Sequence, residues 1–424
     1  MNRYMELLNK AGIDTYIITT RKVKSAELFF IKKNLDMRRM KDVEHVGIEI
    51  FKDSEENGQK LRARAALILN PSMKDEEILE RIEAAEYEAS FAMNPFFELP
   101  EKETSDEVVM ESTLNGMPLS KVADAFVEAV YSEDCDEKAF INSFELFVNE
   151  GHTHIITSEG TDVAYVKREV KGEFVAQCKD PQDVETYQNF TYDSMTLGDI
   201  KNLVKTTLKM TADRAIAKDM PKSGNTNVII SDKYMADMVS FYFERAHSAY
   251  VFMKYSNYAV GTKVQGEDVK GDLVNIDFGV SVPFNEEGIA MKEREFIKEG
   301  ELKTMHGSMR FSRYLGMKPI GTYSKAVLPE GSVSFAEMVK EPCLHVVNFS
   351  DFQMDSMSGH FGGEIRLAYY YDGKGNVKPV TGGSVNGIIF DAQKDMYFSK
   401  EMQNIADYSG PRALLLKNIA VAGE

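Results

Sequence analysis

The chain has 424 residues, of which 43% are hydrophobic and 28% are charged, proportions typical of a folded globular protein and not of a disordered one. A single core rarely extends beyond about 250–300 residues, so two or three domains are expected. Asp and Glu outnumber Lys and Arg by 67 to 50, which gives a net charge of −17. A protein this acidic repels phosphate backbones, and the composition therefore argues against a nucleic-acid partner.

One short segment departs from the acidic composition. Lys32, Lys33, Arg38, Arg39 and Lys41 lie close together, but apolar and acidic residues are interleaved with them. They do not form the segregated basic patch that nucleic-acid binding requires.

The cysteines and the hydropathy pattern indicate the compartment. Cys135, Cys178 and Cys343 are far apart and odd in number, which is typical of a reducing compartment and argues against a disulfide framework. The first residues contain no apolar signal-peptide core, and no apolar run approaches the ~18 residues of a membrane span. We therefore expect a soluble, cytoplasmic protein with no membrane partner.

The first half alternates helix-like and strand-like segments. Helical spacing of apolar residues predicts helices at residues 4–10, from 72 to the Asn94-Pro95 pair, at 120–131 and at 197–218. β-Rich or alternating patterns predict strands at residues 14–20, 46–51, 61–69, 140–148 and 153–178, with turns at Gly58, Gly151, Gly160 and Gly172.

The second half has a different texture. Residues 221–225 are the best linker candidate, and a strand at 227–230 and a helix at 235–246 follow them. From Gly261 onward the chain consists of short β-rich pieces separated by glycines. The predicted class is therefore α+β, with a mixed α/β N-terminal domain at residues 1–220 and a β-rich, antiparallel C-terminal domain at residues 221–424.

Near the carboxyl end, the apolar residues 413–416 and 419–421 are predicted to be strands. They lie either wholly inside their own domain or partly under a second protomer, because exposed edge strands favour pairing with another chain.

Some of the histidines are candidate metal ligands. Glu244 and His247 are one helical turn apart and face the same side, which suits two ligands but is also common on helix surfaces. The sequence contains neither HExxH nor HExxxH.

Two further pairs have the spacing of same-face residues on a strand. His152 and His154 form one pair, for which an exposed strand face is the alternative. Cys343 and His345 form the other, for which a buried thiol beside a satisfied imidazole is the alternative.

No nucleophile motif is complete. Residues 382–386 depart from the nucleophile elbow because Asn386 replaces its last glycine. His360 lies in the glycine run at 359–363, which without a paired nucleophile is more simply a tight turn. The residues alone therefore predict no catalytic or cofactor-binding site, and a metal site only if Glu244, His247, Cys343, His345 or His360 are brought together.

A series of short segments in the second half is more informative through its order than through any one member. In chain order they are residues 256–261 (SNYAVG), Asp277, 283–289 (PFNEEGI), 296–303 (FIKEGELK), 312–316 (SRYLG), 321–323 (GTY), 356–361 (SMSGHF), 377–387 (VKPVTGGSVNG), 410–415 (GPRALL) and 419–423 (IAVAG). This order resembles the TldD/PmbA family, members of which were once described as modulators of DNA gyrase.

The resemblance implies two α+β domains and a substrate held in the cleft of a dimer. The family pairs a catalytic subunit, TldD, with a companion, PmbA or TldE, in a metal-dependent peptidase, and TldD-like members carry HExxxH on a helix. Counting back from Ser256, that motif falls near residues 239–244, which read VSFYFE and lack both histidines and the glutamate base. The chain therefore resembles the companion. His360 departs from the family's usual Asp or small polar residue.

Three functions follow as hypotheses. The first is a companion, cleft-forming subunit that binds an extended peptide and works as a homodimer or with a HExxxH-bearing relative. The second is a self-sufficient metallopeptidase whose zinc is held by the five residues named above. The third is a peptide-binding scaffold without any role in proteolysis. Metal content distinguishes the first two, and peptide cleavage in mixtures distinguishes the third.

Overall fold

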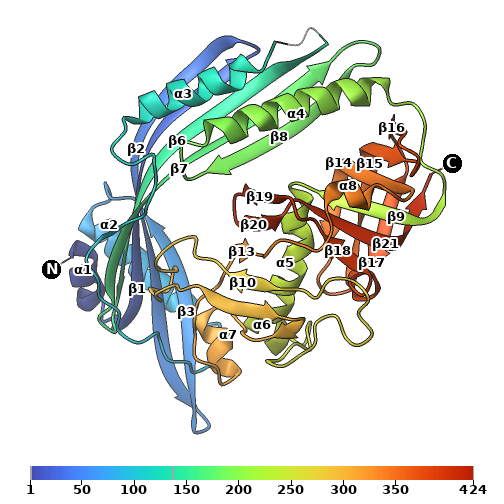
Figure 1. The fold of residues 1–424 in the computed structure, drawn as a ribbon. Coiled ribbons are helices and arrows are strands. Elements are labelled where there is room, and N and C mark those ends of the chain that lie inside the picture. Colours follow the sequence, from blue (N-terminus) through green and yellow to red (C-terminus); the bar gives the residue numbers. More distant parts are fainter. Residues whose placement is uncertain (1, 136–137, 424) are drawn as a thin grey trace.

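The computed structural model describes residues 2–135 and 138–423 and places them around three β-sheets (Figure 1). The N-terminal half supplies the first sheet, which contains, in spatial order, β4 (Asn94–Pro95), β3 (Gln59–Leu69), β2 (Asn34–Glu56), β1 (Thr15–Ile31), β6 (Ala139–Thr157), β7 (Asp162–Cys178) and β5 (Val108–Val109), with β8 (Val184–Tyr192) also paired to β7.

The long strands of this sheet are joined by tight hairpins. Two residues, Asn57 and Gly58, connect β2 to β3, and both have positive φ, as a primed hairpin turn requires. Lys32 and Lys33 likewise connect β1 to β2. Pairing satisfies the backbone hydrogen bonds of these strands but leaves the apolar face of the sheet uncovered. Helices are therefore needed to cover that face.

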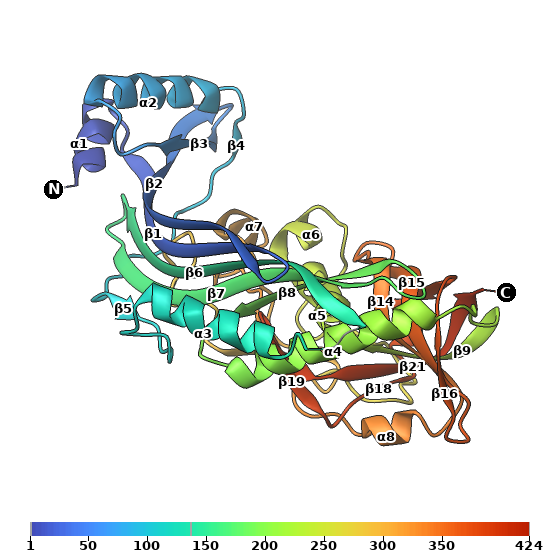
Figure 2. The ribbon, with the colours of Figure 1, turned by 90° about the horizontal axis from the view of Figure 1, so that it is seen from above.

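Helices cover the sheet in two places. α1 (Arg3–Lys10) and α2 (Asp75–Ala89) pack on one end of it, whereas α3 (Leu119–Ser132) and α4 (Leu197–Ile216) pack along its outer face (Figure 2). α1 begins at Asn2, whose side chain accepts a hydrogen bond from the backbone N–H of Tyr4 at 2.9 Å. The inner face of the sheet is turned toward the C-terminal half.

The C-terminal half contains the other two sheets. One has the order β12 (Glu301–Leu302), β11 (Arg294–Lys298), β10 (Ile276–Phe278), β13 (Ala326–Val327), β20 (Tyr408–Pro411) and β19 (Met402–Ile405). The other has the order β14 (Cys343–Met354), β9 (Gly224–Ser231), β21 (Ala413–Ala422), β17 (Ser384–Ile388), β15 (His360–Tyr371) and β16 (Val377–Val380), with β18 (Met396–Phe398) on β21. Because β14 also pairs with β15, five strands of this sheet close into a ring.

Helix α5 (Tyr234–Ala246) supplies much of the core between these sheets, through Met235, Met238, Phe241 and Phe243. The remaining helices are short: α6 (Ser248–Phe252), α7 (Met309–Tyr314), α8 (Phe335–Met338) and α9 (Ile389–Ala392). A smaller apolar cluster joins the two halves, in which Ile17, Ile155 and Val163 of the first sheet meet Phe284 and Met309.

The α+β class is confirmed, with corrections. The helix predicted from residue 72 begins at Asp75 and ends at Ala89, before Asn94-Pro95. Gly151 and Gly172 lie inside β6 and β7 and not at turns, and a Cβ on Gly172 would lie 2.4 Å from Cζ of Phe190. Gly224 and Asn225, predicted as linker, begin β9. The C-terminal half is mostly antiparallel, but β9–β14 and β13–β20 are parallel pairs.

Two further expectations concern boundaries and covering. β21 lies between β9 and β17, so residues 413–416 and 419–421 are covered within their own sheet and need no second protomer. A division into domains at residues 1–220 and 221–424 stays a prediction. Within residues 2–135 and 138–423, no helix has the length and apolarity needed to span a membrane.

Candidate functional site

A tight turn at residues 285–288 lies where the two halves meet. Asn285 Oδ1 accepts hydrogen bonds from the backbone N–H groups of Glu287 at 3.1 Å and Ile289 at 2.8 Å. Gly288 has φ +78°, and a Cβ there would lie 2.8 Å from Cγ2 of Thr161 in the N-terminal half. The turn therefore requires glycine for its backbone conformation and for its close contact with the first sheet.

The carboxylate of Glu287 points from this turn toward the first residue of α7. It accepts the backbone N–H of Met309, at 2.9 and 3.1 Å to its two oxygens, and the side-chain amide of Asn285 at 3.3 Å. Burial raises the pKa of Glu287 to about 7, although both sets of hydrogen bonds favour the ionised form. Near neutral pH this carboxyl group therefore populates both protonation states.

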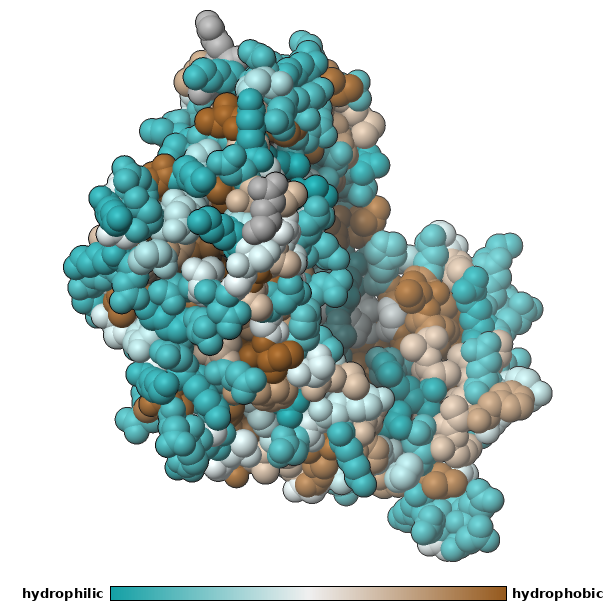
Figure 3. All heavy atoms as spheres, turned by 90° about the vertical axis from the view of Figure 1, so that its right-hand side faces the viewer, coloured by the Kyte–Doolittle hydropathy of each residue, from teal (hydrophilic) through white to brown (hydrophobic). Residues whose placement is uncertain are grey.

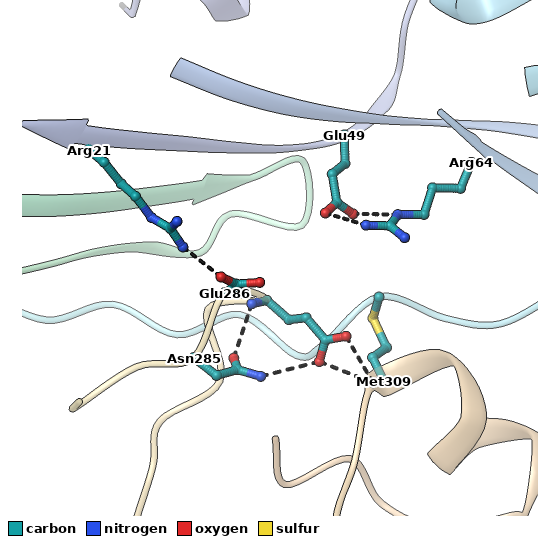
Figure 4. Close-up of polar contacts among 7 residues, drawn as sticks. Arg21, Glu49, Arg64, Asn285, Glu286 and Met309 are labelled. Carbon is teal, nitrogen blue, oxygen red and sulfur yellow. Dashed lines mark hydrogen bonds and ion pairs between the residues drawn. The ribbon is translucent and has the colours of Figure 1, made fainter. Parts of the chain in front are cut away.

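Two ion pairs flank Glu287 on the inner face of the first sheet (Figure 4). Arg21 of β1 reaches across to Glu286 at 2.6 Å, and Arg64 of β3 holds Glu49 of β2 through two bonds of 2.6 and 2.8 Å. Hydrogen bonding to Glu49 raises the pKa of Arg64, and the charges of Glu287 and Glu286 act in the same direction. Residues from both halves thus form one network of alternating charges.

A cavity of about 460 Å³ opens beside this network. The first sheet lines it with Arg21, Thr153 and Tyr165, which are direct cross-strand neighbours on β1, β6 and β7. The C-terminal half lines it with residues of two loops: Val282, Phe284, Asn285, Glu286, Glu287 and Thr322. The lining combines hydroxyl, guanidinium, amide and carboxylate groups with apolar side chains.

Two other cavities lie along the same boundary. One of about 370 Å³ is lined by residues 100–103 and by Gly288, Arg294 and Arg313 among others. The other, of about 510 Å³, lies between β8 and α4 on one side and β19 and Arg412 on the other. On the side of the molecule drawn in Figure 3, the surface is hollowed between two lobes, and apolar side chains line part of the hollow.

The chemistry of the central cavity favours binding. Its lining residues include no cysteine, serine or histidine, so a paired nucleophile and imidazole base are not among them. Its hydroxyl, guanidinium and carboxylate groups can donate to and accept from the amide groups of an extended polypeptide. In the sequence the 285–288 turn stands out only as part of a longer motif, because nothing local to it shows that Glu287 is partly buried between the two halves.

The sequence candidates Glu244 and His247 lie at the end of α5. Glu244 accepts a hydrogen bond from the Tyr250 hydroxyl at 3.3 Å, and His247 Nδ1 accepts the backbone N–H of Ala249 at 3.1 Å and so caps α6. Burial lowers the pKa of His247. Its ring lies 5.3 Å from the ring of His306, a neighbour that sequence spacing gave no reason to select.

His306 has no lone pair left for a metal. Its Nε2 donates to the backbone oxygen of Phe243 at 2.9 Å, and its Nδ1 accepts the backbone N–H of Tyr323 at 3.0 Å. Burial lowers its pKa to about 3, so the ring is neutral at physiological pH. His306 therefore links the end of α5 to the segment at Tyr323.

Cys343 and His345 lie on β14 and are engaged separately. Burial raises the pKa of the Cys343 thiol to about 11, which opposes formation of the thiolate that binds metals. His345 Nε2 lies 2.8 Å from Ser231 Oγ, and that hydroxyl donates to Asp232 at 2.8 Å. Burial lowers the pKa of His345 to about 4.

His360 lies apart from these residues. It is exposed at the start of β15, opposite Ile388, whereas Cys343 pairs with Tyr371 at the far end of the same strand. Within the part of the chain that the structure describes, no three His, Cys, Asp or Glu side chains are placed to hold one metal ion. The five residues of the metal hypothesis are therefore not brought together.

His152 and His154 are also engaged separately. His152 Nε2 lies 2.6 Å from a Glu107 oxygen, and His154 Nε2 lies 2.7 Å from an Asp162 oxygen. Each imidazole thus has its own carboxylate partner, and the two do not share a ligand.

The C-terminal half of the chain matches a known protein domain. Residues 223–423 match the family described as the PmbA/TldA metallopeptidase C-terminal domain. The sequence matches no curated protein. Together with the α+β fold, this match defines the class of protein as a relative of the PmbA/TldA metallopeptidases.

Solved structures share the fold over nearly the whole chain. A proposed modulator of a DNA gyrase from Thermotoga maritima is 17% identical, with a TM-score of 0.78 and coverage of 99% of this chain and 98% of that one. TldE from Thermococcus kodakarensis is 15% identical, with a TM-score of 0.78 and coverage of 99% and 100%. A proposed modulator of DNA gyrase from Bacteroides thetaiotaomicron is 14% identical, with a TM-score of 0.75 and coverage of 99% and 97%. Residues 223–423 thus form a C-terminal domain of the TldD/PmbA family.

The metallopeptidase family implies zinc, and within residues 2–135 and 138–423 no group of three His, Cys, Asp or Glu side chains is placed to hold it. The α5 window at 239–244 reads VSFYFE, and His306, the neighbouring imidazole, already uses both ring nitrogens. A catalytic zinc needs about three protein ligands and an open position. No catalytic step is therefore derived through a metal.

Proposed function

We propose that this chain is the companion subunit of a TldD/PmbA-type peptidase system and that it contributes a peptide-binding cleft without a zinc site of its own. The observation that carries the proposal is the α5 window, where Val239 and Glu244 stand in place of the two histidine ligands and Ser240 stands in place of the general base. The cavities between the two halves support the second part, because their linings offer polar groups but no cysteine, serine or histidine.

The proposed partner is a HExxxH-bearing relative, or a second copy of this chain, and the proposed substrate is an unfolded, extended peptide. Extended peptides are bound largely through their backbone amides, which suits a row of side chains such as Arg21, Thr153 and Tyr165. A cytoplasmic location belongs to the same proposal.

The test measures assembly and cleavage together. The chain, a HExxxH-bearing relative from the same genome and their mixture are compared by sedimentation velocity and by cleavage of an unfolded peptide. We expect a complex, and cleavage in the mixture at least tenfold above that of either chain alone. Stoichiometric zinc in the purified chain, or cleavage unaffected by adding it, contradicts the proposal.

A matched pair of variants tests the cavity. Thr153→Trp fills the space beside Arg21 and Tyr165, whereas His152→Trp places the same bulk on the opposite face of β6. We expect the first substitution to reduce cleavage in the mixture at least tenfold while the complex still forms, and the second to leave cleavage within about twofold. Equal effects of the two variants contradict a role for the cavity.

A further inference from the structure

The hairpin arm of β1 and β2 has an open strand edge. β3 pairs with β2 only from Val46 to Glu56, so residues 34–45 of β2 have β1 on one side and no strand on the other among the described residues. In the β2–β3 ladder the even-numbered residues of β2 bond to β3, because the two-residue turn makes Glu56 and Gln59 a bonded pair. Continued along β2, this alternation directs the backbone N–H and C=O groups of Arg38, Met40, Asp42 and Glu44 outward.

This edge carries four exposed large apolar side chains among its charged ones. Met40 is 64% exposed, Leu35 50%, Met37 43% and Val43 38%, and they lie on both faces of the arm. An unpaired, apolar edge is a template for another strand. A long exposed arm of this kind therefore has both the main-chain groups and the flanking apolar contacts that bind an extended segment.

The charge of the arm indicates which kind of polypeptide segment it would bind. Arg39 and Lys41 share one buried carboxylate, that of Glu27, with Lys41 at 2.7 Å, so two cations are balanced by one anion. Arg38, on the other face, makes no ion pair with any described residue. Residues 34–45 themselves carry three basic and three acidic side chains, but the arm from Arg21 to His45 carries eight basic and four acidic ones. In a chain of net charge −17, the arm as a whole is therefore a local cationic surface.

Two other roles are conceivable for this edge: protection against unwanted pairing, and pairing with a second copy of the chain. Both fit its side chains less well than binding of a segment of another polypeptide does. Cationic side chains on edge strands commonly prevent unwanted pairing, but that role does not account for four exposed large apolar side chains beside them. Pairing of two copies of β2 about a two-fold axis centred on residue 39, 40 or 41 sets Arg39 or Lys41 opposite a cation of the other copy, and these like-charge pairs oppose dimerisation. An axis at residue 40 also sets Arg38 opposite Asp42, a pair that favours it.

We propose that the open edge of β2, residues 34–45, is a docking surface for an extended, acidic segment of another polypeptide, which adds a strand to the first sheet. None of residues 34–45 lines the central cavity, although His45 pairs with Arg21 at its rim. The proposal therefore goes beyond the companion function and does not depend on it.

Fluorescence anisotropy with the full chain tests the proposal. The probe is a labelled peptide of about ten residues in which glutamate alternates with valine and threonine, long enough to span the edge. Its counterparts are a lysine-for-glutamate peptide and a peptide N-methylated at alternate residues, which cannot pair along one edge. We expect binding of the acidic peptide only, with each counterpart at least tenfold weaker.

Two variants and a control locate the site. Met40→Pro removes one outward N–H without breaking a bond to β1, and Arg38→Glu reverses an unpaired charge; each should weaken binding at least tenfold. Lys222→Glu makes the same charge change at another exposed position and should leave binding within twofold. Far-ultraviolet circular dichroism and melting of all three proteins check that they are folded.

Three outcomes overturn the proposal. Equal binding of the N-methylated peptide or to Met40→Pro excludes strand pairing, and equal binding of the lysine peptide excludes an acidic occupant. Concentration-dependent dimerisation that Met40→Pro abolishes, without binding of the acidic peptide, assigns the edge to a second copy instead.

Discussion

Glu287 shows how one carboxyl group is placed between opposing effects. Backbone and amide donors from Met309 and Asn285 favour its anion, whereas burial and the nearby Glu49 charge disfavour it. Because burial is the larger effect, the pKa is about 7 instead of the ordinary 4.5. His306 shows the opposite case, in which burial keeps a base neutral while both ring nitrogens are used for structure.

The first prediction concerns the pH dependence of stability. Since the pKa of Glu287 is higher in the folded chain than its ordinary value, the folded state binds this proton more tightly, and its contribution to stability falls as pH rises from about 4.5 to about 7 and is constant above that. Glu287→Gln removes the charge and keeps an oxygen that accepts from Met309. We expect the variant to gain roughly 1–3 kcal/mol in free energy of unfolding at pH 8 and almost nothing at pH 4.

Urea denaturation at both pH values measures this difference, with Glu286→Gln as the exposed control. A gain of the same size at pH 4 and pH 8, or an equal gain in the control, contradicts the assigned burial of Glu287.

At the scale of elements, the sequence predicted structure where the pattern came from a single buried face. The helices at 4–10, 120–131, 197–218 and 235–246 correspond closely to α1, α3, α4 and α5, because each buries one apolar stripe. The strand predicted at 14–20 instead continues to Ile31, and β2 begins at Asn34. Exposed charged residues hide the alternation in β2, since residues 34–45 bury little of either face.

The candidate site was harder to predict, for a related reason. Arg21, Thr153 and Tyr165 are adjacent only because three strands pair in one register, and the sequence between them gives no sign of this. Cys343 and His345 have suggestive local spacing and both lie on β14, but their side chains are engaged separately, and His360 lies at the far end of the paired strand β15. Local motifs predict which residue types are present and not which of them the topology brings together.

The second prediction compares two contacts between the halves. The Arg21–Glu286 pair is exposed, with side chains 50% and 81% accessible, so Arg21→Ala should cost less than about 1 kcal/mol of stability. Phe284 is buried among Ile17, Ile155 and Val163 of the first sheet, so Phe284→Ala should cost about 2–5 kcal/mol. Urea denaturation of both variants measures the ranking, and the reverse order would show that charges, and not apolar contacts, hold the halves together.

At the scale of the whole molecule, the fold presents two separate surfaces. The cavities lie on the inner face of the first sheet, between the halves, whereas the open edge of β2 lies on an arm that extends past β3. The sheets of the C-terminal half include a closed ring of five strands, which leaves β21 no free edge. Strand addition is therefore expected on the N-terminal half, and cleft binding where the two halves meet.

The last prediction concerns nucleic acid, because two of the similar structures are described as modulators of DNA gyrase. Of the five cations in the basic segment, Arg39 and Lys41 are paired with Glu27, and Lys33 lies 3.6 Å from Asp134. About two cations thus remain for phosphates, and a complex of about two phosphate contacts has a salt slope near −2 and little affinity at physiological salt. The net charge of −17 further opposes association.

We therefore expect no shift of a labelled duplex by about 10 μM protein at 150 mM salt, and only weak binding at 20 mM salt that Arg38→Glu abolishes. Salt titration of the anisotropy of the duplex checks this, with the acidic peptide as competitor. Binding that persists at 150 mM salt, with a slope that requires six or more phosphate contacts, would locate a cationic surface outside the arm. If instead the acidic peptide displaces the small amount of bound duplex, the arm binds DNA only weakly and only as a polyanion. Any connection of this fold to DNA enzymes then runs through protein contacts.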